Sequence, residues 1–335
     1  MTRTVDVHAH VLPPLLIEVA DRGRARWGID FRRGDGGRME FNAAGRWLPL
    51  LQQTDVYRET PAARAARMRR MRVDVQVLSL SPSLFLYLED RDHAAEFCAD
   101  VNDAIAAFVG EEPSSFRGFA MLPLSHPGSA VAELERTRSL PGFVGAVVAT
   151  HVNGRDWDHP ELLPVLEAAA GLEVPIFVHP ASVRASEVLG RHHLRNLVGN
   201  PLETTLAMAA FVFGGVLDRF PSLRLCFAHG GGYGVFAMGR FDHGHRVRAE
   251  ARSAHIPSEY LSRMWFDCLT HDESAVRFLI DKAGASRIVL GSDDPADMGL
   301  ANPVDWIEAC NSLSDEERSQ ILGANAVGLF GDSLG

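Results

Sequence analysis

The sequence predicts a (β/α)₈ barrel, and three observations support this fold class. Eight short apolar runs of strand length occur along the chain, Ala- and Leu-rich segments with helical periodicity separate them, and no G-x-G-x-x-G motif follows the first run. Alternating strands and helices indicate a parallel sheet, and eight such units favour a closed barrel over an open sheet. The missing glycine motif disfavours a dinucleotide-binding fold. We therefore expect residues 1–335 to form one barrel domain.

The predicted strands are almost continuously apolar, as expected for parallel strands that are buried on both faces. They span residues 4–8, 73–80, 116–122, 144–150, 175–179, 223–229, 264–268 and 288–292. Helical periodicity separates them at residues 62–71, 93–109, 129–138, 161–170, 202–219 and 273–282. After the last strand, additional helices are expected at 303–312 and 315–322, with Ser314 as an N-cap before Glu317.

One segment, at about residues 11–57, does not follow this alternation. It is too long for a simple connection between a strand and its helix. It contains Pro13-Pro14, a Gly- and Arg-rich stretch at 32–37 and a short apolar run at 39–41. We interpret it as an insertion, containing a small hairpin, over the carboxyl-terminal face of the barrel.

Composition excludes several classes of function. The net charge of −10 argues against binding to nucleic acid or to an anionic membrane surface. No apolar stretch is long enough to span a bilayer, and no apolar signal segment follows Met1. The four cysteines form no C-x-x-C pair. We therefore expect reduced thiols and a cytoplasmic protein.

Four histidines and one aspartate fall at the carboxyl ends of predicted strands. His8 and His10 flank the end of the first, His179 ends the fifth, His229 ends the sixth, and Asp293 follows the eighth. The chain has 14 histidines, and an isolated histidine is usually a surface or core residue. In a parallel barrel, however, these strand ends meet on the face that carries active sites. Imidazoles with a carboxylate there favour Zn²⁺ or a similar divalent ion.

Six motifs are distributed from residue 5 to residue 293. They are VDVHAH at 5–10, VDVQV at 73–77, FVHP at 177–180, NPLETT at 200–205, FAHGGG at 227–232 and LGSD at 290–293. Together they resemble the amidohydrolase superfamily, and within it they are most similar to the branch that includes α-amino-β-carboxymuconate-ε-semialdehyde decarboxylase. The resemblance implies that His8, His10, His179 and Asp293 bind one divalent metal ion, expected to be Zn²⁺. It also implies that His229 acts as the acid/base beside the catalytic Asp293.

The same resemblance implies how substrate is held. Arg240 is similar to an arginine of this branch that binds a substrate carboxylate in a neighbouring subunit, which implies a homodimer. Arg46, inside the insertion, is similar in placement to a second such arginine. Guanidinium groups suit small carboxylate substrates because they bind both oxygens. The structural alternative for either residue is a surface ion pair.

A bridging lysine is absent where many relatives in the superfamily carry one. Their fourth strand holds a modified lysine between two metals, whereas residues 144–149 here contain none. The single lysine of the chain, Lys282, lies in a late predicted helix. A lysine-bridged pair of metals is therefore excluded, which favours a single ion.

These features lead to one main functional hypothesis and two alternatives. We expect non-oxidative decarboxylation of a small unsaturated or aromatic carboxylic acid. The first alternative is a hydrolase or hydratase of the same superfamily, and the second is a binding protein that has lost activity. Asp294 and Ala296 replace aromatic residues that are common in this branch, so a more acidic or more open pocket is expected. His151 is a further candidate to face the pocket.

Overall fold

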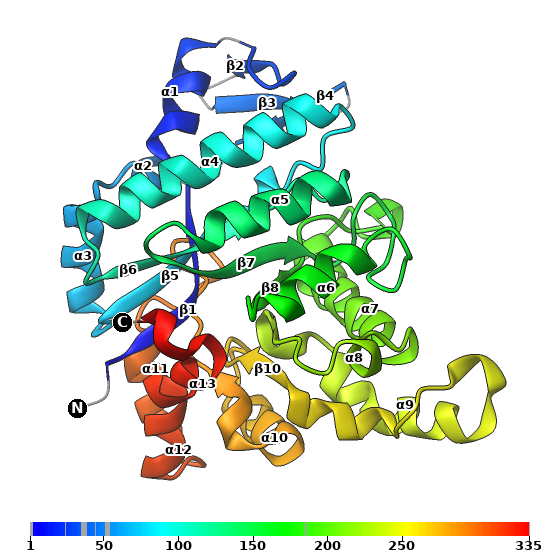
Figure 1. Ribbon diagram of the computed structural model, residues 1–335. Helices are drawn as coiled ribbons and strands as arrows, with labels where there is room; N and C mark the ends of the chain where they lie inside the picture. Colours follow the sequence, from blue (N-terminus) through cyan, green and yellow to red (C-terminus); the bar gives the residue numbers. More distant parts are fainter. Residues whose placement is uncertain are drawn as a thin grey trace.

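The computed structural model describes residues 3–23, 25–34, 39–43, 45–50, 54–184 and 186–334. Eight parallel strands form one sheet, in the order β1-β5-β6-β7-β8-β9-β10-β11, with helices around it (Figure 1). The last strand of the sheet lies beside the first. Val7 donates its N–H to the Leu290 carbonyl at 2.9 Å, and Ala9 forms a parallel bridge with Asp294. The predicted (β/α)₈ barrel is confirmed.

The strands agree with the predicted runs, with shifts at their ends. They are β1 (Val5–Val11), β5 (Val75–Leu80), β6 (Phe116–Met121), β7 (Phe143–Ala149), β8 (Ile176–His179), β9 (Leu225–Phe227), β10 (Met264–Asp267) and β11 (Ile288–Val289). Almost every strand residue is buried, as the apolar runs predicted. β1 extends past its predicted end, so both His8 and His10 lie within a strand. β9 ends early, and His229 therefore lies in a turn.

The helices cover the outside of the barrel. They are α3 (Pro61–Arg70), α4 (Arg91–Glu111), α5 (Pro127–Arg138), α6 (Leu163–Gly171), α7 (Asn200–Phe213), α8 (Val216–Arg219), α9 (Gly234–Val247), α10 (Glu273–Ala283), α11 (Pro303–Ala309), α12 (Asp315–Ser319) and α13 (Asn325–Phe330). The expected cap of α12 is present as a full capping box between Ser314 and Glu317. The single helix predicted at 202–219 is divided into α7 and α8, because Gly215 adopts a φ of 69° between them.

The insertion is larger than the hairpin that the sequence predicted. It contains α1 (Pro14–Arg22), α2 (Thr54–Tyr57) and an antiparallel sheet in the order β2-β3-β4, formed by β2 (Phe31–Arg33), β3 (Met39–Ala43) and β4 (Arg46–Pro49). Trp27 packs edge-on against Phe97 of α4 and donates its indole N–H to Asp100 at 2.8 Å. Figure 1 shows the insertion beyond the carboxyl end of β1 and beside α4.

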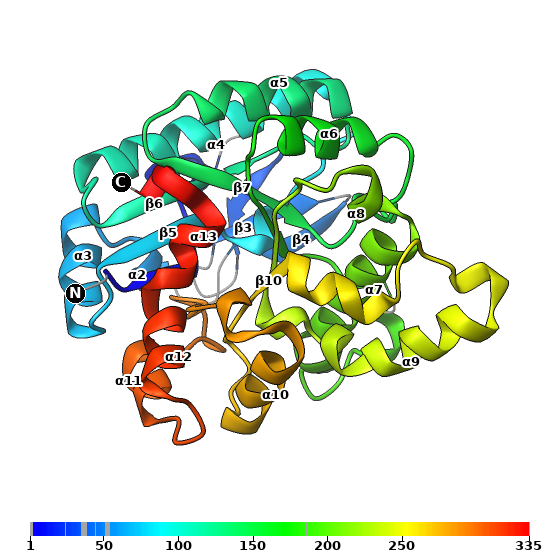
Figure 2. The ribbon, with the colours of Figure 1, turned by 60° about the horizontal axis from the view of Figure 1, so that its bottom comes forward.

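α9 is the element that departs most from the barrel outline. Figures 1 and 2 both show it extending away from the ring of strands and helices. Near its start the side chains of Tyr233 and Phe236 are 41% and 81% exposed. The exposed apolar surface at the root of this arm is therefore available for contact with another molecule.

Two expectations from composition can be compared with the structure. Among the described residues, no helix has the length and apolar character needed to cross a membrane. Cys98, Cys226, Cys268 and Cys310 are all buried and unpaired.

Candidate metal centre

Two predicted ligands, His8 and His10, project from one face of β1. Side chains two residues apart on a strand point the same way, and the Nε2 atoms of these imidazoles lie 3.3 Å apart. His8 donates from Nδ1 to Asp267 Oδ2 at 2.6 Å. His10 donates from Nδ1 to Ser79 Oγ at 2.9 Å, because the Ser79 hydroxyl itself donates to the Ala9 carbonyl. These partners fix both rings and leave both Nε2 lone pairs available to a cation.

His179, the last residue of β8, contributes a third lone pair. Its Nδ1 donates to the Pro180 carbonyl at 2.8 Å, so the unprotonated nitrogen of the neutral ring is Nε2. That Nε2 is buried and has no hydrogen-bond partner within the described part of the chain. Buried polar atoms rarely remain unsatisfied. A metal ion among the three imidazoles accounts for this one.

His229 and Asp293 stand in turns rather than in strands. Their φ angles are 55° and 60°, in a region that residues other than glycine seldom adopt. The Asp267 carboxylate accepts the N–H of His229 at 3.0 Å and that of Gly230 at 2.9 Å. The N–H of Asp293 bonds to the His8 carbonyl at 2.8 Å. Such hydrogen bonds maintain backbone strain that costs about 1–3 kcal/mol per residue.

The three glycines after His229 let this turn approach helix α7. A Cβ atom added to Gly232 would lie 2.2 Å from the carbonyl oxygen of Pro201, and the φ of Gly232 is 61°. Both the close approach and the backbone conformation require glycine at this position. The close contact fixes the turn, and with it His229, against the start of α7.

The five predicted residues come together at the carboxyl ends of the strands. Ligand atoms of His8, His179, His229 and Asp293 all lie within 4.8 Å of one another, a grouping that can hold a metal ion. His10 adjoins this group, with its Nε2 2.8 Å from Asp293 Oδ1. His8 Nε2 lies 3.3 Å from the same oxygen, and His229 Nε2 lies 3.8 Å from Asp293 Oδ2. The Asp293 carboxylate is thus the common centre of the cluster.

The electrostatics of the cluster also suit a cation. Burial raises the pKa of Asp293, but the surrounding imidazoles outweigh burial and hold that pKa well below its usual range. Burial lowers the pKa of His8, yet Asp293 and Asp267 together raise it to about 10. Burial and the adjacent imidazoles lower the pKa of His179 far below its usual value. Positive charge is therefore favoured between the two carboxylates, and a divalent ion can replace the proton of His8 there.

Arg240, one of the two predicted substrate arginines, is not part of this cluster. Arg240 is exposed on α9, and among the described residues it has no hydrogen-bond or ion-pair partner. Arg46 begins β4, but its side chain lies outside the described part of the structure. The role of both arginines stays a prediction.

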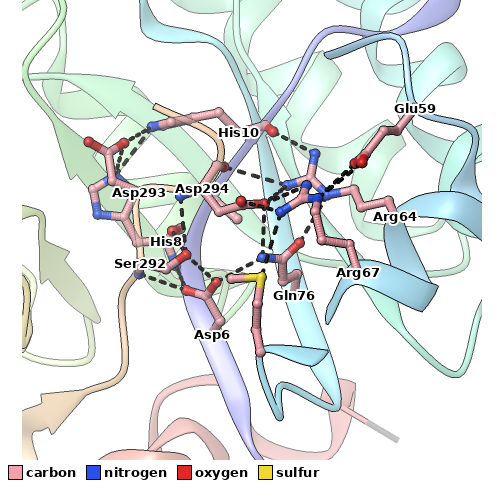
Figure 3. A network of polar contacts seen from close by, with 12 residues as sticks. Asp6, His8, His10, Glu59, Arg64, Arg67, Gln76, Ser292, Asp293 and Asp294 are labelled. Carbon is pink, nitrogen blue, oxygen red and sulfur yellow. Dashed lines mark hydrogen bonds and ion pairs between the residues drawn. The ribbon is translucent and has the colours of Figure 1, made fainter. Parts of the chain in front are cut away.

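The sequence predicted a more acidic or more open pocket around Asp294. The acidic alternative is wrong, and the more open pocket stays a prediction. Its carboxylate is buried and bonds to Arg64 at 3.0 Å and to Arg67 at 3.1 Å (Figure 3). Burial raises the pKa of Asp294, but the two guanidinium groups outweigh burial and lower it. The negative charge is therefore neutralised inside the protein. The side chain that replaces an aromatic residue forms an ion pair rather than an acidic wall.

His151, at the end of β7, belongs to a separate polar cluster. Its Nδ1 accepts the N–H of Gly154 at 3.1 Å, so its Nε2–H faces Ser182 Oγ at 3.1 Å. Glu203 of α7 lies 3.9 Å from the same nitrogen and accepts two hydrogen bonds from Arg184. These contacts tie the loop after His179 to α7.

Sequence reasoning missed the residues that support the ligands. Asp267 lies at the end of a predicted strand, and Asp6 lies within a quoted motif. A carboxylate in an otherwise apolar strand was the available signal, because such a group must be paired when buried. Arg64 gave no signal, since it is one of many arginines in a predicted helix.

Comparison with protein families gives a match along nearly the whole chain. The family model described as amidohydrolase matches residues 5–331. The chain is 32% identical over 332 residues to 2-amino-3-carboxymuconate-6-semialdehyde decarboxylase of Dictyostelium discoideum, covering 98% of this chain and 91% of that protein.

Solved structures share the fold at lower identity. The crystal structure of 5-carboxyvanillate decarboxylase from Sphingomonas paucimobilis superposes with a TM-score of 0.83 at 21% identity, covering 98% of this chain and 99% of that one. A dihydroxybenzoic acid decarboxylase from Polaromonas, solved with bound manganese and an inhibitor, gives a TM-score of 0.76 at 22% identity, covering 98% and 97%.

Proposed function

The chain belongs to the amidohydrolase family, and on that premise we propose that it is a metal-dependent decarboxylase of a small aromatic or unsaturated carboxylic acid. The observation that carries this proposal is the convergence of His8, His179, His229 and Asp293 in a chain 32% identical to a decarboxylase over 98% of its length.

We propose that His8, His10, His179 and Asp293 hold one divalent ion. The Nε2 atoms of His8 and His10 lie 3.3 and 2.8 Å from Asp293 Oδ1. The Nε2 of His179 is buried without a hydrogen-bond partner among the described residues, and the Nδ1 of each of the three rings is hydrogen-bonded. Nitrogen and oxygen donors of this kind suit Zn²⁺ and Mn²⁺, and a related decarboxylase was solved with manganese. When bound, the ion acts as a Lewis acid that polarises an oxygen of water or substrate. The absent strand lysine leaves a single ion as the expected content.

His229 is the residue proposed to move the proton. Its side chain is 21% exposed, more than that of His8, His10 or Asp293, so it borders the space open to substrate. Decarboxylation breaks the bond between the carboxylate group and the substrate carbon that carries it. The electron pair stays on that substrate carbon, and CO₂ is released. Delivery of a proton from His229 Nε2 to that carbon completes the reaction. The second carboxylate or hydroxyl group of a substrate would be held by an arginine.

Arg240 is the proposed arginine, acting on the site of a second copy. It lies on the projecting arm α9, whose base exposes Tyr233 and Phe236, so a homodimer would bury this apolar surface. Sedimentation that shows only a monomer would remove this part of the proposal. Arg46 of β4 is the second candidate.

The buried, unpaired cysteines fit the cytoplasm as the expected compartment.

The decisive experiment measures metal content first and reaction products second. We expect about one divalent ion per wild-type chain, and loss of that ion in His179→Ala, because the variant lacks one of the lone pairs. His93→Ala, on the surface helix α4, is the matched control and should retain the metal. The loaded enzyme is then incubated with a panel of hydroxyaryl and semialdehyde carboxylates, and CO₂ is measured.

Two results would contradict this function. Water added to a substrate without release of CO₂ would favour the hydrolase or hydratase alternative. Absence of metal in wild-type protein, even after divalent ions are supplied, would favour the binding alternative.

A further inference from the structure

A second layer of charged side chains lies behind the metal centre, around Asp294. Figure 3 shows Asp293 turned toward the imidazoles, whereas the carboxylate of Asp294 points to the guanidinium groups of Arg64 and Arg67. The backbone of Asp294 is also held. Its carbonyl accepts the N–H of His10 at 2.7 Å, and its own N–H bonds to Ser292 Oγ at 3.1 Å. The residue next to a predicted ligand is thus fixed through both backbone and side chain.

Arg64 joins β1, β5 and the segment after β11 through one buried guanidinium group. The residue is 2% exposed and comes from α3. It donates to the carbonyl of His10 on β1 at 2.8 Å, to Gln76 Oε1 on β5 at 2.9 Å and to Asp294 Oδ2 after β11 at 3.0 Å. A planar guanidinium group presents its N–H donors in a fixed geometry, so it can donate hydrogen bonds to several separate acceptors at once. Arg64 therefore links the backbone of one predicted ligand to the residue after another.

Arg67 completes the charge balance. It binds both Asp294 oxygens through its terminal nitrogens and both Glu59 oxygens through Nε. Two arginines thus face two carboxylates in a largely buried network. Removing one member leaves a charge without its partner, which is strongly unfavourable away from water.

The network continues to the other predicted ligand of β1. Gln76 donates to Asp6 at 3.0 Å. Asp6 in turn accepts the N–H of His8 at 3.2 Å and the hydroxyl and N–H of Ser292 at 2.6 and 3.0 Å (Figure 3). The two chain segments that carry His8, His10 and Asp293 are therefore connected by side chains from β1, β5 and α3.

We propose that Arg64, Arg67 and Asp294, which we call the charge clamp, are positioning residues for the metal centre. The clamp holds β1 against the turn after β11, so that His10 and Asp293 meet the same cation. Among the described residues, its hydrogen bonds reach ligand backbone but no ring or carboxylate atom of a ligand. It therefore acts through backbone position alone. The proposal rests on the metal site of the proposed function and not on the reaction.

The test measures Mn²⁺ affinity of the metal-free protein by competition with a chromogenic chelator, beside its thermal unfolding. Arg67→Met and Asp294→Asn should each lower the affinity about tenfold, the range seen when support of a metal ligand is lost. In the double variant, the fold loss of Mn²⁺ affinity should be smaller than the product of the two single losses, because both substitutions remove the same ion pair between Arg67 and Asp294. Arg72→Met is the control. Arg72 pairs with Glu308 at the surface just after α3, so Mn²⁺ affinity should not change.

Unchanged Mn²⁺ affinity in the folded single variants would overturn the proposal, because the ion pairs would then contribute to stability alone. If Arg67→Met does not fold, Arg67→Lys decides. A lysine ammonium cannot span Glu59 and both Asp294 oxygens, so the affinity should still fall, and wild-type affinity would reject the clamp. Wild-type protein that binds Mn²⁺ but releases no CO₂ would contradict the proposed function and leave this comparison intact.

Discussion

His8 and His10 project from strand β1, whose register against β5 shifts between Asp6 and Ala9, whereas His229 and Asp293 stand in turns with φ angles of 55° and 60°. In the half formed by β1, the alternation of side chains along a strand places both imidazoles on one face, and their Nε2 atoms lie 3.3 Å apart. In the turn half, strained backbone must be held by other parts of the chain. The two halves therefore depend on different supports. The sheet places the two strand histidines, whose rings are then fixed by Asp267 and Ser79, whereas the two turn residues depend on backbone hydrogen bonds and close packing from neighbouring elements.

Asp267 is the residue shared by both halves, and its loss should have the largest effect. One of its oxygens accepts from the His8 ring and from the His229 backbone. Asp267→Asn places an amide N–H or a weaker acceptor against these donors. We expect Mn²⁺ affinity to fall about 10–100-fold, measured by chelator competition. The control is Asp218→Asn, which removes a carboxylate bonded to Tyr260 away from the cluster. A fall in affinity of less than threefold would mean that each half is positioned without Asp267.

Gly232→Ala tests the turn half alone. The new methyl group would press on the Pro201 carbonyl, and we expect a loss of about 1–3 kcal/mol in the free energy of unfolding, measured with urea. Gly215→Ala is the control for a positive φ without a close contact, since Gly215 has a φ of 69° and no atom within 4 Å of an added Cβ, although its ψ of 16° differs from the −127° of Gly232. Equal losses in both variants would show that backbone conformation, rather than the contact with α7, holds the turn.

The smallest expected effect concerns His151, which lies outside both halves. Burial, assisted by Arg184, lowers its pKa from 6.5. A lowered histidine pKa gives stability that is present above about pH 6.5 and lost as the pH falls below that value. His151→Gln should therefore lose less stability than wild type between pH 7.5 and 5.5, by less than about 1 kcal/mol. Parallel urea curves at both pH values check this. An identical acid loss in both proteins would exclude His151 as its source.

The same contrast explains how far the sequence could predict the site. Strand periodicity and position at strand ends were sufficient to select His8, His10 and His179, which the folded chain brings into one cluster, because both signals are local. The motif around His229 and Asp293 identified those residues, but not the positive φ angles that bring them into the cluster. Such angles depend on contacts that form only in the folded chain.

The supporting residues were harder to predict, because their partners are remote. Asp267 and His8 are 259 residues apart in the sequence, and Arg64 and Asp294 are 230 apart. Neither pairing leaves a periodic pattern. Asp294 was interpreted as an acidic residue of the pocket. The sequence does not show which way α3 faces, so its arginines Arg64 and Arg67 could not be predicted to lie against Asp294. The insertion was underestimated for a similar reason, since a third short strand has no clear alternation of its own.

The closure between β11 and β1 has a consequence for the order in which the protein is made. Ser292 and His8, which bond across this seam, are 284 residues apart, and β11 has only two residues. A nascent chain carries His8, His10 and His179 long before Asp293 is synthesised. The proposed ligand set is therefore complete only after the eighth strand has closed the ring. A cation held at the proposed site would link the first and last strands of the barrel and would help to keep the two-residue strand β11 in place.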